Sequence, residues 1–368
     1  MTQNGRDIQL DKSISSHLPA GHEVISVTPL GLSENCDTTR IEVRLPDGSV
    51  KRYFEKASTG QHGFELMRAH YHSEGTIGAF IPNSVPPSVA FVTYQSDPNR
   101  HAFLMEFVDM IDDELPGPEP FMQTIAALHQ QSAGKSPEGK FGFPVDTKFA
   151  HLTTPNFWTD KWEEWWTRHM EMVFEREASE RGTRTEEEDE LVNFYLHKAI
   201  PRFIRPLESN GRSVQPTLLH TDLWPGNVKF KLDNETVCIF DANAMWGHNE
   251  MELGLIANPR YPLGEEYIEE YWKLIPVSEP EEDADSRVIM YMIRHQACLA
   301  SVYTEEARLR DIWADNVRIL RDRYLAEDHI EVNKKSFNHN SSIGIEDEGV
   351  DLNNKMDMSA GVNVLAVP

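Results

Sequence analysis

A short segment near position 220 carries the side chains best suited to chemistry in this chain of 368 residues. Asp222 follows His220 by two positions, and Asn227 comes five positions after Asp222. A further aspartate, Asp241, closes the second apolar run after this segment. Phosphoryl transfer by the kinase route needs a carboxylate beside the attacking hydroxyl, and an Asn and an Asp that hold Mg²⁺. We therefore expect Asp222 to act as catalytic base and Asn227 and Asp241 to be magnesium ligands.

Two short strands should position these side chains. Residues 228–232 alternate apolar and polar side chains, as a half-buried strand does, and residues 237–240 form a continuous apolar strand. A hairpin of this length folds Asp241 back beside Asn227, so that both can bind one cation. Asp and Asn are also common turn residues, which is the alternative for each of them taken alone. The spacing of the whole trio favours the magnesium site.

Three further side chains are candidates for the substrate side. Trp224 lies inside the loop and could stack on a flat or sugar-ring substrate. His248 and Glu250 follow Asp241 closely, so we expect them to line the acceptor pocket. Hydrogen bonding inside the protein core is the alternative for these two.

These residues resemble the aminoglycoside phosphotransferase and choline kinase superfamily, with its signature His-Gly-Asp-x-x-x-x-Asn followed by Asp. Asp222-Leu223-Trp224 is similar to the narrower fructosamine kinase, or ketosamine 3-kinase, family. Further matches are Gly-His-Asn-Glu-Met-Glu-Leu at 247–253, Phe-Gly-Phe at 141–143, Asn-x-Trp-x-x-x-Trp at 156–162, and a segment at 275–283 that resembles fungal-type ribulosamine 3-kinases. The resemblance covers about residues 24–327. Thr221 stands where the signature has Gly, and Glu252 where the family has Asp.

The resemblance implies an α+β, bilobal protein-kinase-like fold with a small β-rich N-terminal lobe and a large, mostly helical C-terminal lobe. Alternation at 40–45 and 50–56 predicts a hairpin in the first lobe, and apolar residues at helical spacing follow position 120. We expect an N-terminal extension at 1–22, an ATP-binding lobe at 23–110, a catalytic and substrate lobe at 111–330, and a disordered, polar tail at 331–368.

ATP and Mg²⁺ are the cofactors that the resemblance implies. Lys56 ends a strand where the family has its ATP-phosphate lysine, although a strand-end lysine can also simply be solvated. Glu106 and Val108 fall in the hinge whose backbone would bind adenine.

One departure from the family concerns the glutamate that holds this lysine. In a kinase, a Glu on the following helix, here expected at about 63–74, pairs with the lysine. The aligned position is His70, and Glu65 or Glu74 could substitute only if the helix shifted. The departure keeps open a nucleotide-binding pseudokinase that acts as an interaction module.

For an active enzyme, the resemblance implies that the acceptor is the sugar of a ketosamine, such as a ribulosamine or fructosamine on a lysine amine or a free amine. The expected partner is therefore a small-molecule or glycated-amine substrate. A kinase of another small-molecule alcohol, biosynthetic or detoxifying, is the alternative.

Composition limits the remaining function classes. The net charge is −25 without a basic stripe, so we expect no nucleic-acid partner. No apolar run is long enough to span a membrane, and the polar N-terminus lacks a signal peptide, so we expect a cytoplasmic protein. The charge run at 175–190 should be a solvated face. The sequence leaves the oligomeric state open.

Overall fold

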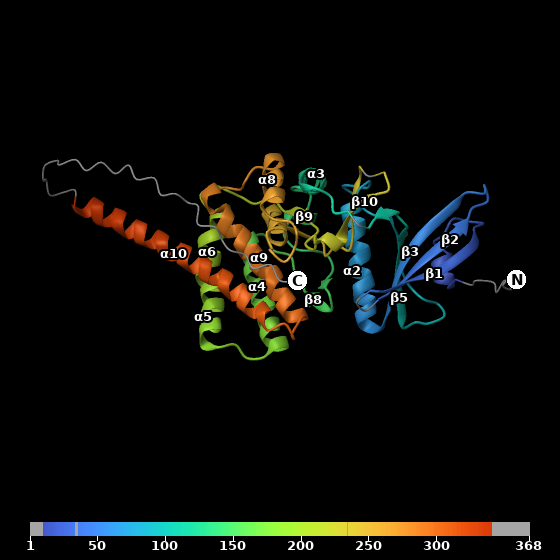
Figure 1. Ribbon diagram of the computed structural model, residues 1–368, viewed down its shortest axis with the longest axis horizontal. Helices are drawn as coiled ribbons and strands as arrows, with labels where there is room; N and C mark the ends of the chain where they lie inside the picture. Colours follow the sequence, from blue (N-terminus) through green and yellow to red (C-terminus); the bar gives the residue numbers. More distant parts are fainter. Residues whose placement is uncertain (1–9, 34–35, 113, 234, 341–368) are drawn as a thin grey trace.

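The computed structural model describes residues 10–33, 36–112, 114–233 and 235–340. Figure 1 shows a β-rich lobe formed by the first part of the chain beside a larger helical lobe. The predicted α+β, bilobal architecture is therefore confirmed.

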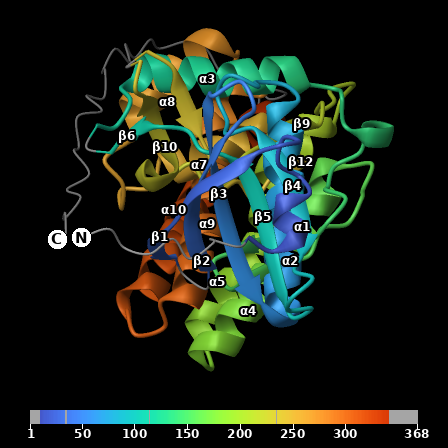
Figure 2. The same ribbon diagram turned by 90° about the vertical axis from the view of Figure 1, so that its right-hand side faces the viewer.

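The N-terminal lobe is built on a five-stranded antiparallel sheet in the order β1-β2-β3-β5-β4. In Figure 2 the molecule is turned so that this lobe faces the viewer. Its strands are β1 Glu23–Ser33, β2 Cys36–Arg44, β3 Val50–Thr59, β4 Ser88–Thr93 and β5 Arg100–Glu106. The predicted hairpin is the β2–β3 pair, in register at Arg40 and Phe54. Helix α2, Gly60–Gly78, packs on β3, β4 and β5, so it carries His70 toward the strand that holds Lys56.

Part of the expected N-terminal extension belongs to this lobe. Helix α1, Lys12–Ser15, packs on β4, and Ile14 joins the core of the sheet because its side chain is 1% exposed. Asp11 accepts hydrogen bonds from the backbone N–H groups of Gln95 (3.0 Å) and Ser96 (2.9 Å). Residues 1–9 lie outside the described residues.

The C-terminal lobe is mainly helical. Its helices are α3 Pro118–Ser132, α4 Trp162–Arg181, α5 Glu186–Phe194, α6 Ile200–Phe203, α7 Leu253–Ile256, α8 Glu265–Leu274, α9 Ala284–Val302 and α10 Arg308–Asn340. Short strands complete it: β6 Met110–Ile111, β7 Thr147–Phe149, β8 Leu152–Thr154, β9 Thr217–Leu219, β10 Val228–Lys231, β11 Val237–Ile239 and β12 Met245–Gly247. Helix α9 packs between α4, α7 and α10, and Trp162, Trp165 and Trp166 of α4 are fully buried. None of the helices within the described ranges is long and apolar enough to cross a membrane.

Helix α10 crosses the boundary at which we expected the disordered tail to begin. It runs to Asn340, so residues 331–340 are helical rather than irregular. Position 344 holds the first Gly or Pro after the helix begins, and each added residue gains a hydrogen bond once a helix has started. The low apolar content was therefore a poor signal here. The rest of the expected tail, 341–368, lies outside the described residues.

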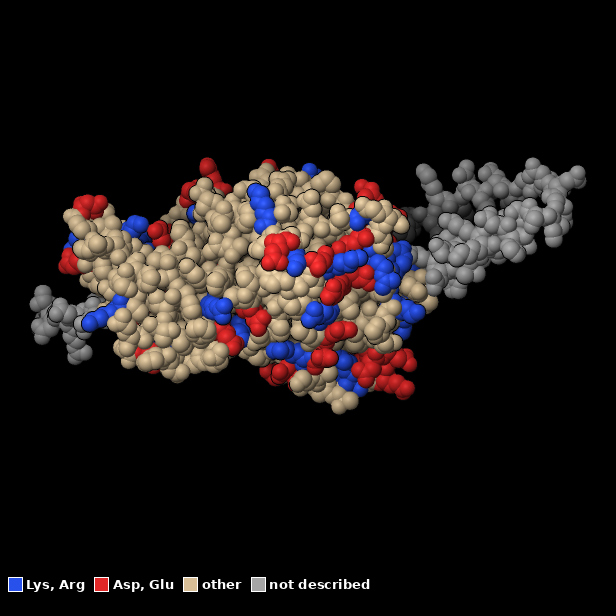
Figure 3. Space-filling view, turned by 180° about the vertical axis from the view of Figure 1, so that it is seen from behind, with Lys and Arg blue, Asp and Glu red and all other residues tan. Residues whose placement is uncertain are grey.

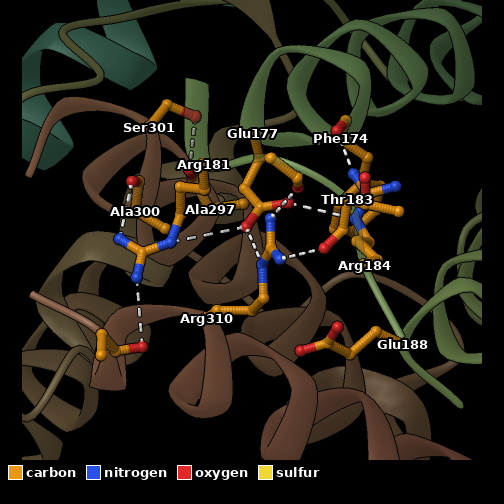
Figure 4. A network of polar contacts seen from close by, with 12 residues as sticks. Phe174, Glu177, Arg181, Thr183, Arg184, Glu188, Ala297, Ala300, Ser301 and Arg310 are labelled. Atoms are coloured by element: carbon orange, nitrogen blue, oxygen red, sulfur yellow. Dashed lines mark hydrogen bonds and ion pairs between the residues drawn. The ribbon is translucent and has the colours of Figure 1, made fainter. Parts of the chain in front are cut away.

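The charge run at 175–190 is not a uniformly solvated face, because Glu177 on α4 is completely buried. Its carboxylate binds the guanidinium groups of Arg310 (2.6 Å) and Arg184 (3.1 Å), with Arg181 at 4.0 Å (Figure 4). On the face of the helical lobe seen in Figure 3, acidic and basic side chains are interspersed at the surface. The buried Glu177 carboxylate links α4 to Arg310 at the start of α10. The run of charged residues in the sequence did not indicate this contact.

Candidate functional site

The predicted hairpin is confirmed and follows the candidate loop directly. Strands β10 and β11 pair antiparallel with Val228 opposite Ile239. Phe240, at the end of the hairpin, donates its backbone N–H to the carbonyl of Asn227 over 3.1 Å. β10 also pairs with β6 directly after the hinge between the lobes, so hairpin and hinge form one small sheet. Positions 227 and 241 are thereby adjacent in space.

Asp222, Asn227 and Asp241 all line one cavity of about 420 Å³, which we call the Asp222 cavity. The Asn227 side-chain N–H group donates to the Asp222 carbonyl (2.9 Å) and to its carboxylate (3.0 Å). Since the nitrogen of the amide is used in this way, its oxygen remains as a ligand for a cation. The structure thus brings the trio to one place.

Glu252 holds the loop that carries Asp222. This glutamate lies in the 3-10 turn Asn249–Glu252, is 2% exposed, and accepts the backbone N–H groups of His220 (2.7 Å) and Thr221 (2.8 Å). The His220 ring contacts the Phe240 carbonyl over 3.0 Å and accepts the Asp222 N–H over 3.2 Å. These contacts fix the backbone on both sides of the candidate base.

Thr221 occupies a conformation that β-branched residues rarely adopt, with φ of 64°. Its hydroxyl donates to the carbonyl of Asn243 over 2.9 Å, which links the loop to the segment just after Asp241. A glycine, the residue of the superfamily signature, would adopt this φ without strain but would have no hydroxyl to make that link. The departures at 221 and 252 therefore contact each other and support the same loop.

The two aspartates of the cavity differ in their electrostatic surroundings. Burial, reinforced by the charge of Asp241, raises the pKa of Asp222 to about 7. Burial acts on Asp241 in the same direction, but the adjacent Lys56 ammonium, together with His70 and His220, outweighs it and lowers the pKa of Asp241. Paired carboxylates whose pKa values are pushed apart are typical of sites that divide proton transfer and charge binding between them.

Lys56 on β3 forms an ion pair with Asp241 and is almost fully buried. Neither glutamate that we considered as its partner takes that role. Glu65 binds Lys148 over 2.6 Å, and Glu74 accepts the Ala242 N–H over 3.0 Å. Burial raises the pKa of Glu74 to about 8, so a neutral carboxylic acid braces the backbone next to Asp241.

His70 fills the helix position at which the family has its glutamate. Its Nδ1 lies 3.8 Å from the Asp241 carboxylate, and burial, together with the Lys56 charge, lowers the pKa of His70 to about 4. The imidazole is therefore neutral at pH 7 and does not compete with Asp241 for the lysine.

A second cavity, of about 460 Å³, lies against the hinge. Glu106 and Val108 line it together with apolar side chains such as Phe54 and Met105, which suits a flat base. The Glu106 carboxylate forms an exposed ion pair with Lys51 over 3.1 Å. This hinge cavity shares both Lys56 and Asp241 with the Asp222 cavity, so that the two spaces meet at the ion pair.

Of the candidates for the substrate side, only Trp224 lies in the Asp222 cavity. Our expectation for His248 and Glu250 was wrong, because both are buried in the helical lobe. His248 contacts the hydroxyls of Tyr291 (2.8 Å) and Ser278 (2.9 Å), while Glu250 pairs with Arg287 (2.7 Å). Closeness to Asp241 in sequence did not determine the direction in which these side chains point.

Sequence reasoning also missed residues of the site. Glu252 was visible only as a departure within the motif at 247–253, and Arg260 and Tyr261, which line the Asp222 cavity, had no sequence signal. Glu74 was considered for Lys56 but not for the backbone after Asp241.

The donor set of the cavity fits magnesium. One carboxylate oxygen from Asp241 and one amide oxygen from Asn227 are hard ligands, and Mg²⁺ takes one or two protein groups plus phosphate oxygens. Among the residues that the structure describes, no three His, Cys, Asp or Glu side chains converge as a metal cage. Such a site would bind Mg²⁺ together with a nucleotide rather than alone.

Comparison of the sequence with known proteins identifies the family of this chain. A family model described as Fructosamine kinase matches residues 36–309. A protein-ribulosamine 3-kinase of Oryza sativa subsp. indica is 29% identical over 208 residues, 54% of each chain, so this chain spans about half the length of that relative. A ketosamine-3-kinase of Mus musculus is 36% identical over 121 residues, which are 32% of this chain and 35% of the mouse protein.

Solved structures resemble this chain in fold. A protein from Thermobifida fusca assigned as a fructosamine-3-kinase superposes with a TM-score of 0.65 at 22% identity, covering 86% of this chain and 100% of that one. An aminoglycoside phosphotransferase in a complex with ADP and hygromycin B gives a TM-score of 0.53 at 13% identity, with 81% and 94% covered.

Proposed function

The chain belongs to the fructosamine kinase family, and we propose that it transfers the γ-phosphoryl group of ATP to a hydroxyl of a ketosamine sugar. The observation that carries the proposal is the meeting of two cavities at the Lys56–Asp241 ion pair. One cavity has the size and lining for a nucleotide, and the other holds Asp222. A phosphoryl group at the junction lies between donor and acceptor, as in-line transfer requires.

The hinge cavity receives ATP in this proposal. Adenine packs against the apolar side chains and bonds to the hinge backbone at Glu106 and Val108, while Lys56 binds the phosphates. Asn227 and Asp241 would hold Mg²⁺, which would neutralise phosphate charge. Lys56 then exchanges part of its contact with Asp241 for the phosphate oxygens.

Asp222 receives the proton of the attacking hydroxyl. With a pKa of about 7 it is a stronger base than an ordinary aspartate and is still substantially ionised at neutral pH. Asn227 donates to its carboxylate, and Glu252 fixes the loop, so the base is held in one orientation. Trp224, which is 42% exposed at the cavity wall, supplies a flat apolar surface for the sugar.

The acceptor class follows from the family and its named relatives, which act on ribulosamines and ketosamines. The test is ADP release and ³¹P NMR with ATP–Mg²⁺ and ribulosyl-lysine, fructosyl-lysine and a panel of small alcohols. We expect a new phosphate monoester on the ketosamines. Turnover only on another alcohol would contradict the ketosamine proposal and support a kinase of another small-molecule alcohol.

One observation favours a second candidate, a nucleotide-binding pseudokinase, because His70 replaces the helix glutamate. A thermal shift with ATP–Mg²⁺ and no turnover on any acceptor would support it. The neutral state of His70 and the retained Lys56–Asp241 pair favour the active enzyme.

A further inference from the structure

The acceptor side of the Asp222 cavity has an aromatic wall with a cation. Trp224, Tyr261 and Tyr303 supply rings, and Arg260 contributes a guanidinium group. The ring centroids of Trp224 and Tyr261 are 6.4 Å apart, and the Arg260 guanidinium lies 5.5 Å from the centre of the Tyr303 ring. Apart from Trp224, which was assigned to the sugar, the residues of this wall have no role in the proposed reaction so far.

Other cations of the cavity are already neutralised within the protein. Lys56 pairs with Asp241, and Lys148 binds Glu65 over 2.6 Å while also donating to Thr153. Arg260 differs, because its nearest carboxylate among the described residues is that of Glu306, at 3.8 Å and 51% exposed. A pair of that length and exposure contributes little. The other contacts of Arg260 are with neutral groups, the Tyr261 hydroxyl and the Tyr303 ring, so its charge has no close counter-ion among the described residues.

Arg260 is also close to the reacting end of the cavity. Burial raises the pKa of the Tyr261 hydroxyl, and the charge of Asp222 raises it further, which places this ring within electrostatic reach of the base. The hydroxyl of Tyr261 contacts His295 over 3.0 Å, which fixes the ring. Arg260, whose side chain hydrogen-bonds to Tyr261, therefore lines the same cavity as Asp222 and lies beside a ring that senses the charge of the base.

We infer that Arg260 binds a carboxylate on the amine portion of the acceptor. The substrate class is then a ketosamine of a free amino acid, with its sugar against Trp224 and its carboxylate at the guanidinium. An anion needs such a local partner in a protein whose net charge is −25. A planar guanidinium matches a carboxylate through two parallel hydrogen bonds, which a neutral amide cannot reproduce. This inference rests on the proposed function and adds the acceptor class to it.

The experiment compares matched acceptors that differ only in charge. We would measure kcat/KM for ribulosyl-glycine against ribulosyl-glycinamide, and for ε-ribulosyl-lysine against its amide. We expect a preference for the carboxylate of about tenfold or more in at least one pair, the range of a charge-assisted hydrogen bond. R260A should bring the carboxylate-to-amide ratio toward one. R260K should give a ratio between those of the parent and R260A, because lysine keeps the charge but lacks the planar guanidinium that forms two parallel hydrogen bonds.

Arg205→Ala is the matched control, since it removes an equal charge from an arginine that pairs with Glu163 outside this cavity. It should leave the carboxylate-to-amide ratio unchanged. Equal turnover of both members of each pair in the unaltered protein would overturn the role of Arg260 and leave the kinase intact. An equal loss on both acceptors in R260A would also overturn it, by assigning Arg260 to the phosphates. No turnover of any ketosamine would instead remove the proposed function itself.

Discussion

Lys56 forms its ion pair with Asp241 and not with a carboxylate of helix α2. The helix position that would supply a glutamate holds neutral His70, and Glu74, one turn later, binds the backbone after Asp241 instead. The helix therefore supports the backbone that follows Asp241 directly. Asp241 therefore positions Lys56, and in the proposed function the same carboxylate would also bind Mg²⁺.

This arrangement predicts unequal effects of substitution at 56 and 70. K56M should raise the KM for ATP by at least about tenfold, because a charge-assisted contact to the phosphates is lost. H70Q should change kcat/KM by less than about threefold, because the neutral imidazole supplies no charge. Steady-state kinetics against ATP checks both. A collapse of activity in H70Q with normal folding would show that the histidine does more than fill space.

Asp222 should be essential for turnover but not for nucleotide binding. D222N should lower kcat by about 10²–10⁴, the usual range for removal of a general base. The Kd for ATP–Mg²⁺, measured by calorimetry, should stay within a few-fold of the parent value. Asp160→Asn, at an exposed position outside both cavities, is the control. Unchanged turnover in D222N would remove Asp222 from its proposed role.

Glu252 should act as a positioning residue for the loop. In E252Q an amide nitrogen would face one of the two N–H groups that the carboxylate now accepts, so the loop should shift. We expect kcat to fall about 10–100-fold, the scale of a small misplacement of a reacting group, with little change in the KM for ATP. E252D, which keeps both acceptor oxygens, should recover part of kcat, whereas Glu266→Gln at the surface should have no effect. A change confined to the KM for ATP would argue against this role.

Glu177 should be a large contributor to stability. Its side chain is completely buried among Arg181, Arg184 and Arg310, so removing the carboxylate takes away the buried negative charge that these three cations share. We expect E177A to lower the free energy of unfolding by about 3–5 kcal/mol, and Glu180→Ala, on an exposed turn of the same helix, by less than about 0.5 kcal/mol. Urea unfolding of both variants is the measurement. Equal effects would mean that the buried network is energetically neutral.

Stability should also decline in mild acid through His248. Burial lowers the pKa of His248 to about 4, with Arg287 and His129 acting in the same direction and Glu250 opposing them. Between pH 6.5 and about 4 the unfolded chain therefore binds a proton that the folded chain does not, so stability falls as the pH falls. At pH 5 this histidine alone should cost about 2 kcal/mol relative to pH 8.

H248Q measures that contribution, because glutamine at this position does not titrate. The difference in unfolding free energy between pH 8 and pH 5 should be smaller in H248Q than in the parent by about the same 2 kcal/mol. An identical difference in both proteins would show that other groups carry the acid sensitivity.

The order and spacing of Asp222, Asn227 and Asp241 were enough to predict that these side chains meet. They are joined by one loop and one hairpin, whose geometry is local and follows from the alternation of residues 228–232. Strand patterns likewise predicted the β2–β3 hairpin, and the resemblance gave the two-lobe fold. Their roles in catalysis remain predictions for the experiments above.

Only the tertiary structure decided which partner each charged side chain found. Lys56 and Asp241, or Glu177 and Arg310, lie far apart in the chain and meet through the packing of separate elements. The same is true of Glu250, whose side chain points to Arg287 and not into the cavity beside Asp222. Sequence patterns report burial and local periodicity, whereas the direction of a buried polar side chain depends on which hydrogen-bonding group the rest of the fold places next to it.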